Sequence, residues 1–474
     1  MSIEPAQLER LAAREASADG VSGMGVSGMG VSKMGVSDEP PGILQLAWPA
    51  IAGNLAMSVV GIVDIKIVGS LGAEAVAAVT TGHRMFWILQ AVLIAITAGT
   101  TAMVARAWGA GDRLEAARVT KASLVVCVAL ALAFTLPAVL FAEQLAGIFK
   151  LDPETLAQAA RFIRMISLFN AGFAIAMVIG ASLRAAGDTL TPLAIGLITN
   201  VVNIFLVYGL VYGRFGLPAM GVVGAALASG LAFSVGALIS VVLWMRGWLR
   251  IGFQADAWLT AKRVRQLFDI GYPAGLEQAA MQLGFIIFLW IVSNYGTAPY
   301  AAYGIGVQLL SFSFVVAFGF TIAASTHVGQ RLGARDPEGA AHSGWSAVRY
   351  AIVTMVVLGG VVVAFAEPLA RFMIADPEVV RLTVIFIYIL GAVQPLMAID
   401  FTLGGALRGA GDTRFPLFTT LTGLVFVRGT IAAFFAWRGF PVEWIFGALI
   451  FDYMVKSSLL AWRFRSGRWQ HIEI

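Results

Sequence analysis

The chain has 474 residues, of which 59% are hydrophobic and 12% are charged, and its formal net charge at pH 7 is +5. Soluble proteins average about 25% charged residues, so this composition excludes a soluble globular protein and indicates a polytopic membrane protein. The single cysteine and the four histidines exclude a disulfide framework and a cysteine-based metal site, and the sequence shows no nucleophile or metal constellation that would predict an enzyme.

Residues 1–42 differ from the rest of the chain. From Val21 onward they repeat the pentapeptides VSGMG, VSGMG, VSKMG and VSDEP, which contain no core-forming side chains. Such a segment buries too little apolar surface to offset the entropy lost on ordering, and it lacks the apolar stretch of a signal peptide. We therefore predict a disordered low-complexity tail over 1–42.

Hydropathy predicts an all-α polytopic membrane protein with twelve transmembrane helices. The predicted spans are 43–70, 80–106, 122–142, 162–182, 190–213, 219–245, 267–294, 300–330, 350–366, 382–406, 415–437 and 443–462. The longest polar connection, 246–266, separates the sixth span from the seventh. We predict an N-terminal six-helix lobe over 43–245, a cytoplasmic linker over 246–266, a C-terminal six-helix lobe over 267–462, and a cytoplasmic tail over 463–474.

The two predicted lobes repeat in sequence at a constant offset of 224 residues. The segment at Trp48 corresponds to that at Tyr272, VARAWGAGD at Val104 corresponds to VGQRLGARD at Val328, and LRAAGDTLTP at Leu183 corresponds to LRGAGDTRFP at Leu407. Because each lobe has six spans, both lobes enter the membrane in the same orientation. Parallel repeats of this kind place a substrate site at their interface.

The orientation follows from the positive charges. Most of the 32 Lys and Arg residues fall in the tail, the linker and the other connections on that same side of the predicted membrane. The positive-inside rule therefore places both termini in the cytoplasm, in a multi-pass protein of the inner membrane. The RxAGDT blocks then lie in cytoplasmic loops, where their small residues favour a structural hinge.

Asp64 lies within the first predicted span. A carboxylate at mid-membrane costs roughly 2.5–3.5 kcal/mol on insertion scales, so it indicates a partner or a function. The alternative is that Asp64 lies near the far interface, where its charge is solvated or paired. Lys66 is two residues away and lies on another helix face, so we do not expect it to be that partner.

Several blocks, in order across both lobes, resemble the MATE (multidrug and toxic compound extrusion) family of bacterial transporters. The resemblance extends from about residue 43 to residue 469. The segments that carry it are GIVDIKIVGSLG (Gly61–Gly72), GTTAMVARAWGAGD (Gly99–Asp112), NIFLVYGLVYGRFG (Asn203–Gly216), GYPAGLEQ (Gly271–Gln278), NYGTAPYAAYGI (Asn294–Ile305), ASTHVGQRLGARD (Ala324–Asp336) and LRGAGDT (Leu407–Thr413).

This resemblance implies a V-shaped fold of two lobes and a secondary antiporter that exports amphipathic or cationic compounds in exchange for H⁺ or Na⁺. It also implies coupling-ion sites, with no other cofactor. In the first lobe these residues are Asp64, Asn203 and Asn200, although Val207 stands where some members carry a second acid. In the second lobe they are Glu277 and Asp400.

Polar and aromatic residues near the lobe interface are the predicted substrate contacts: Asn54, Gln278, Gln282, Gln308, Gln394, Phe86 and Trp290. Arg428 lies in the middle of the eleventh span, where it either pairs with Asp400 or faces a wet cavity. Asp452 and Lys456 are spaced i, i+4 in the order that favours an ion pair.

The alternative function is a flippase for a lipid-linked or other bulky amphiphile, which predicts a more cationic central cavity than these spans offer. In either case the expected partners are a small organic substrate and membrane lipid, with no nucleic acid. One chain contains a complete cavity, so a monomer suffices for function.

Overall fold

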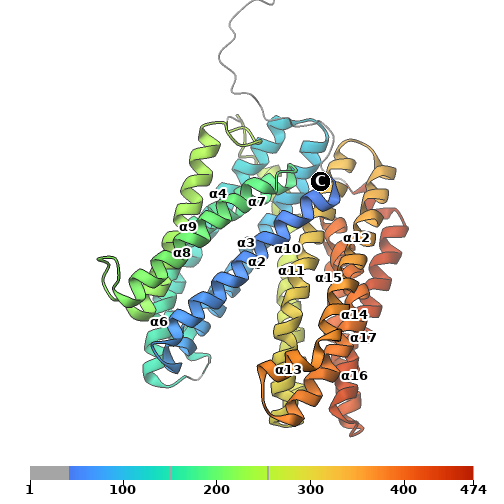
Figure 1. Ribbon diagram of the computed structural model, residues 1–474. Helices are drawn as coiled ribbons and strands as arrows, with labels where there is room; N and C mark the ends of the chain where they lie inside the picture. The colour runs from blue at the N-terminus through green and yellow to red at the C-terminus, as the bar shows by residue number, and fades with distance from the viewer. Residues whose placement is uncertain (1–41, 150, 254–255, 473–474) are drawn as a thin grey trace, which may run out of the picture. The chain divides into compact units, whose positions relative to one another are not determined.

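The computed structural model describes residues 42–149, 151–253 and 256–472, which are helical almost throughout and contain no β-strand (Figure 1). The predicted tail, apart from Gly42, lies outside the described residues. The first half of the chain, blue to green in Figure 1, forms α2 (Ile43–Gly69), α3 (Ala73–Gly109), α4 (Arg113–Leu140), α5 (Ala142–Gly147), α6 (Pro153–Ser167), α7 (Asn170–Ala185), α8 (Leu190–Tyr212) and α9 (Gly221–Met245).

The second half repeats this order. It forms α10 (Ala261–Ser293), α11 (Thr297–Gly333), α12 (Pro337–Ala364), α13 (Ala366–Met373), α14 (Pro377–Gly409), α15 (Arg414–Thr420), the π-helix η1 (Leu421–Arg428), α16 (Gly429–Trp437), α17 (Val442–Arg465) and the 3₁₀ turn η2 (Arg468–His471). Thr260 caps α10 by accepting from the N–H of Arg263, so this helix takes up six residues that we assigned to the linker.

Within the described residues, eleven helical segments are long and apolar enough to cross a membrane. The remaining predicted span, the fourth (162–182), is not one straight helix. It is the pair α6 and α7, bent by 53° at a short break. The carbonyl of Ser167 at the break accepts a hydrogen bond from Thr135 Oγ1 at 3.0 Å, which satisfies a backbone group that the bend releases.

The acidic ends of the repeated blocks start helices. Asp112 and Asp336, which correspond across the repeat, each accept a 2.8 Å hydrogen bond from a backbone N–H three residues later, at Glu115 and Gly339. An aspartate at this position satisfies a donor that the first helical turn leaves without an intrahelical partner. The repeated GAxD sequence therefore stops one long helix and begins the next.

Replacing Asp336 with alanine is expected to lower the free energy of unfolding by about 1 kcal/mol, the typical cost of losing a helix cap. The N–H of Gly339 and the nearby Arg331 hold the pKa of Asp336 below its ordinary value of 3.8. The cap contribution is therefore present above pH 3.8 and is lost as the pH falls through the folded-state pKa. Thermal unfolding in detergent at pH 7 and at acidic pH measures it, with the exposed Asp269→Ala as control. Equal losses for both variants would contradict the cap.

The two halves meet along a contact that we call the seam, formed where α3, α7, α11 and α14 end. A Cβ on Gly109 would overlap the carbonyl of Gln330, and a Cβ on Gly333 would overlap the carbonyl of Arg106, so the backbones of α3 and α11 touch. Gln330 Nε2 also donates to the carbonyl of Ala185 at 2.8 Å. Close backbone approach through glycine is the usual way in which helices associate in membranes.

Residues after α17 cover the seam. Trp469 is fully buried, stacks on Phe464 with ring centroids 4.5 Å apart, and donates to the Phe464 carbonyl at 2.7 Å. The carbonyl of Ile472 then accepts a 2.6 Å hydrogen bond from Arg106, which lies at the end of α3 in the other half. This segment, predicted as a plain tail, therefore links the second half to the first.

Candidate functional site

Asp64 is buried near the end of α2, about one and a half turns before Gly69. Its side chain is 8% exposed, and Oδ1 has no hydrogen-bond partner among the described residues. Lys66, two residues later, is exposed on another face of the helix, as the spacing predicts. Among the described residues, Asp64 is therefore a buried carboxylate that forms no ion pair.

A further buried polar side chain of the first half, that of Asn203, lies on α8, which packs along α2. Asn203 is buried, and its Nδ2 donates to Ser229 Oγ at 3.2 Å, while its Oδ1 has no partner in the described part of the chain. Asn200 lies about one turn earlier and is half-buried, and the position of Val207 is fully apolar and buried. The first half thus contains one buried carboxylate, an anionic oxygen ligand, and amide groups, which supply neutral oxygen ligands. Oxygen ligands of both kinds bind hard cations.

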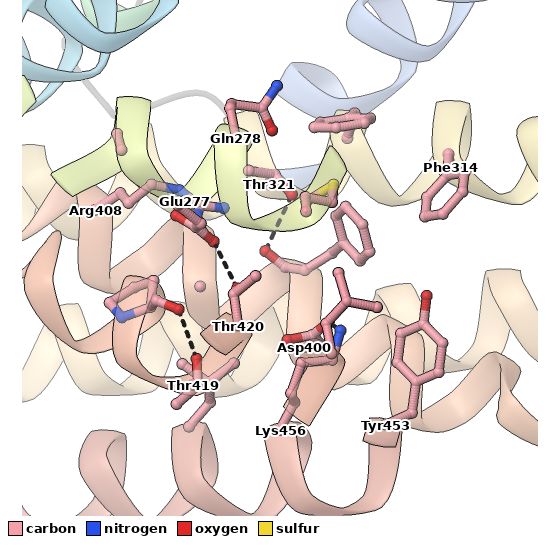
Figure 2. A pocket seen from close by; sticks show the side chains of 18 of the residues that line it. Glu277, Gln278, Phe314, Thr321, Asp400, Arg408, Thr419, Thr420, Tyr453 and Lys456 are labelled. Atoms are coloured by element: carbon pink, nitrogen blue, oxygen red, sulfur yellow. Dashed lines mark hydrogen bonds and ion pairs between the residues drawn. The ribbon is translucent and has the colours of Figure 1, made fainter. Parts of the chain in front are cut away.

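The second half contains a cavity of about 170 Å³. Its wall comes from α10, α11, α14, α15, η1 and α17, with Ile94 and Ala98 of α3 closing one side. Phe314, Phe318 and Phe401 supply aromatic surface. Charged side chains from four of these elements line the same space, and Figure 2 shows several of them directed toward one another.

Glu277 is ion-paired inside this cavity. Both of its carboxylate oxygens accept from Arg408 Nη1, at 2.8 and 2.9 Å, and Thr420 Oγ1 donates to it at 3.2 Å (Figure 2). We placed Arg408 in a cytoplasmic loop, and the structure corrects this: it lies in the last turn of α14. Long side chains at a helix end lean toward the helix N-terminus, which directs this guanidinium back into the cavity.

The pairing of the remaining charges differs from our prediction. Asp400 does not pair with Arg428: it accepts a 2.8 Å hydrogen bond from Lys456, which lies on α17. Arg428 instead forms an ion pair with Asp452, also on α17. The predicted i, i+4 pair of Asp452 and Lys456 is only a secondary contact at 3.8 Å.

The predicted substrate contacts fall in different surroundings. Gln278 lines the cavity, and Asn54 is half-buried on α2. Two others lie in packed cores: Phe86 stacks on Phe233, and Gln394 donates to Ser313 Oγ at 2.7 Å. The remaining three are exposed on α10 and α11: Gln282, Gln308 and Trp290.

Comparisons with known proteins agree with this architecture. The MatE family model matches residues 49–209 and 273–431, so the two matches begin at Pro49 and Pro273, 224 residues apart. The probable multidrug resistance protein NorM of Thermotoga maritima is 32% identical over 438 residues, which cover 90% of this chain and 92% of that protein. The multidrug resistance protein MdtK of Yersinia enterocolitica is 27% identical, and the match covers 81% of this chain and 85% of that protein.

Solved structures show the same fold. A crystal structure of MATE in complex with MaL6 superimposes with a TM-score of 0.83 at 18% identity, covering 90% of this chain and 96% of that one. An outward-facing conformation of a multidrug resistance MATE family transporter of the MOP superfamily superimposes with a TM-score of 0.80 at 19% identity, with the same coverage of both chains. At this identity the likeness concerns the fold: two six-span halves, as the repeat predicts.

Proposed function

The chain belongs to the MATE family, and on that premise we propose that it is a secondary antiporter that exports amphipathic or cationic compounds in exchange for H⁺ or Na⁺. The relatives named as multidrug resistance proteins support this substrate class. We further propose that it acts as a monomer in the inner membrane with both termini cytoplasmic. The seam then lies on the cytoplasmic side.

One observation carries the choice of the coupling residue. Four acidic side chains are buried in the described part of the chain; Glu277, Asp412 and Asp452 are each ion-paired, and Asp64 is not. An intramembrane carboxylate without a counter-ion is the group that a driving cation or a cationic substrate can neutralise in turn. Asp64 is therefore the proposed site of exchange, with Asn203 and Asn200 supplying neutral oxygens.

Exchange needs no chemistry on the substrate. A cationic substrate and the driving cation compete for the same carboxylate, so binding of one releases the other, and the lobes alternate between the two sides. A membrane potential of 100 mV contributes roughly 2.3 kcal/mol per charge moved, which is enough to bias the direction of the cycle. Asn54, Gln278, Gln282 and Gln308 are proposed contacts for the organic substrate.

The test is ethidium efflux from energised right-side-out vesicles, with a pH gradient and a Na⁺ gradient imposed separately. We expect wild type to export with one of the gradients and Asp64→Asn to lose about tenfold or more of that rate, because the exchanging charge is gone. Asp269→Asn, an exposed acid on α10, is the matched control and should export like wild type.

Equal export by Asp64→Asn and wild type, with equal amounts of folded protein, would show that Asp64 has a structural role. Failure of wild type to move ethidium or any other tested cation under either gradient would contradict the proposed substrate class. The same vesicles loaded with a fluorescent lipid-linked sugar would then test transport of a bulky amphiphile.

A further inference from the structure

The wall of the second-half cavity carries no unneutralised negative charge. It exposes two acids, Glu277 and Asp400, and three cations, Arg408, Arg428 and Lys456. Asp452 lies directly behind Arg428 and is fully buried. The six charges therefore sum to zero, and each acid has a cation on a different helix. A cavity of this kind does not attract a further cation as the isolated carboxylate of Asp64 does.

Lys456 is placed as a bound cation would be. Its Nζ is 2.8 Å from Asp400 Oδ2, 3.8 Å from Asp452 Oδ1 and 4.2 Å from the centre of the Tyr453 ring. Two carboxylates and the face of an aromatic ring are the surroundings in which an ammonium is most stabilised away from water. The remaining charges around Asp400 are Glu277 on α10, Arg408 on α14 and Arg428 on η1.

The π-helix holds Lys456 in that position. η1 turns Gly423 toward α17, so that its backbone lies against the methylene stem of Lys456; a Cβ at Gly423 would overlap that stem and come within 2.5 Å of Asp452 Oδ1. The ammonium group is therefore fixed by packing of its stem as well as by charge. π-helical segments are rare and are often found at functional sites.

The first half has no equivalent of this arrangement. The offset falls to 223 in the last hairpin, where Gly216 and Pro218 correspond to Gly439 and Pro441. The counterparts of Lys456 and Asp452 are then Phe233 and Ser229, and that of Arg428, at 224, is Ile204. α9 contains no charged residue, so nothing on it stands in for Lys456 or Asp452. One half thus contains a carboxylate without a cation, and the other contains a carboxylate whose cation is part of the protein.

We propose that Lys456 is a resident cation: it occupies the position that an exchangeable cation would take beside Asp400, and it excludes H⁺, Na⁺ and cationic substrates from the second-half site. Lys456 is in this sense a specificity-determining residue of the antiport. This proposal rests on the proposed function, because it takes exchange to occur at one carboxylate, that of Asp64 in the first half.

The proposal predicts a latent sodium site that appears when the ammonium is removed. Lys456→Met keeps the length and apolar character of the stem, leaves Asp400 without its cation, and gives the cluster a net negative charge. To exclude any contribution from the first half, binding of ²²Na⁺ is compared in purified Asp64→Asn and in Asp64→Asn/Lys456→Met, with choline chloride keeping the ionic strength constant.

We expect no saturable ²²Na⁺ binding to Asp64→Asn, one ion per chain in Asp64→Asn/Lys456→Met, and loss of that ion when Asp400→Asn is added. We also expect the melting temperature of the double variant to rise with sodium and not with choline, because a ligand that binds the folded state stabilises it. Asp64→Asn/Lys66→Met, which removes an exposed lysine instead, is the matched control and should bind no sodium.

A measurement without any Lys456 variant covers the case in which that variant does not fold. In Asp400→Asn alone, the concentration of driving cation that gives half-maximal export should stay within twofold of wild type, whatever happens to the maximal rate. A tenfold shift would overturn the proposal, as would a sodium ion bound by Asp64→Asn and lost on adding Asp400→Asn. Neither result depends on the ethidium assay of Asp64→Asn. If Asp64 is not the coupling residue, that assay shows it separately.

Discussion

Arg428→Met is expected to lower the free energy of unfolding by about 3–5 kcal/mol, the cost of leaving a buried charge without its partner. Arg428 is 2% exposed, and the carboxylate that it pairs with, Asp452, is fully buried. The guanidinium also lies over the rings of Phe288 and Tyr453, so the substitution removes stacking as well as charge. Thermal and denaturant unfolding in detergent measure this loss.

The control for this prediction is Arg428→Met/Asp452→Leu, which removes both charges together. Because replacing a whole buried pair with apolar residues is often neutral, this double variant should recover most of the lost stability, while Lys456 keeps its contact with Asp400. A single variant as stable as wild type would mean that Asp452 finds another counter-ion, Lys456 being the nearest at 3.8 Å.

Gly109→Val is expected to open the seam. Even a Cβ at this position would overlap the Gln330 carbonyl, so α3 and α11 must separate, at a cost of about 1–3 kcal/mol for overpacking. That cost falls only on the state in which the seam is closed, so the conformational equilibrium shifts toward the seam-open state, and export falls by about tenfold.

Maleimide labelling of a cysteine at Ala185 measures the opening, in protein with Cys127→Ala. Ala185 is fully buried, and its carbonyl accepts from Gln330 in the seam. Labelling should be faster in Gly109→Val than in the parent protein. Gly360→Ala is the control, because a Cβ there meets nothing within 4 Å. Equal labelling of the three proteins would show that the seam absorbs the added side chain.

The sequence predicts the helices well because the membrane imposes a simple rule: about 20 apolar residues for each crossing. Eleven helical segments in the described residues follow that rule. The rule cannot detect the bend between Ser167 and Asn170, because both arms are apolar and the released carbonyl of Ser167 is satisfied by Thr135, which is far away in sequence.

Ion pairing is harder to predict than the position of a helix in the sequence. The sequence gives the position of a charged residue along its own helix, whereas the partner of that residue depends on which helices are neighbours in the fold. Arg428 and Asp400 lie on consecutive predicted spans, but both pair with residues of α17: Arg428 with Asp452, and Asp400 with Lys456. Asp64 could be singled out because it is a carboxylate within an apolar span, and no described residue forms an ion pair with it.

The segment over the seam has a consequence for how the protein is made. Arg106 is synthesised early, but its 2.6 Å partner, the carbonyl of Ile472, follows every helix that the structure describes. During translation the first half can insert and pack while this contact is still missing, since domains generally fold in the order of their synthesis. The nascent protein is therefore expected to sample the seam-open state freely until Trp469 and Ile472 have left the ribosome, because the contact with Arg106 stabilises the closed seam only from then on.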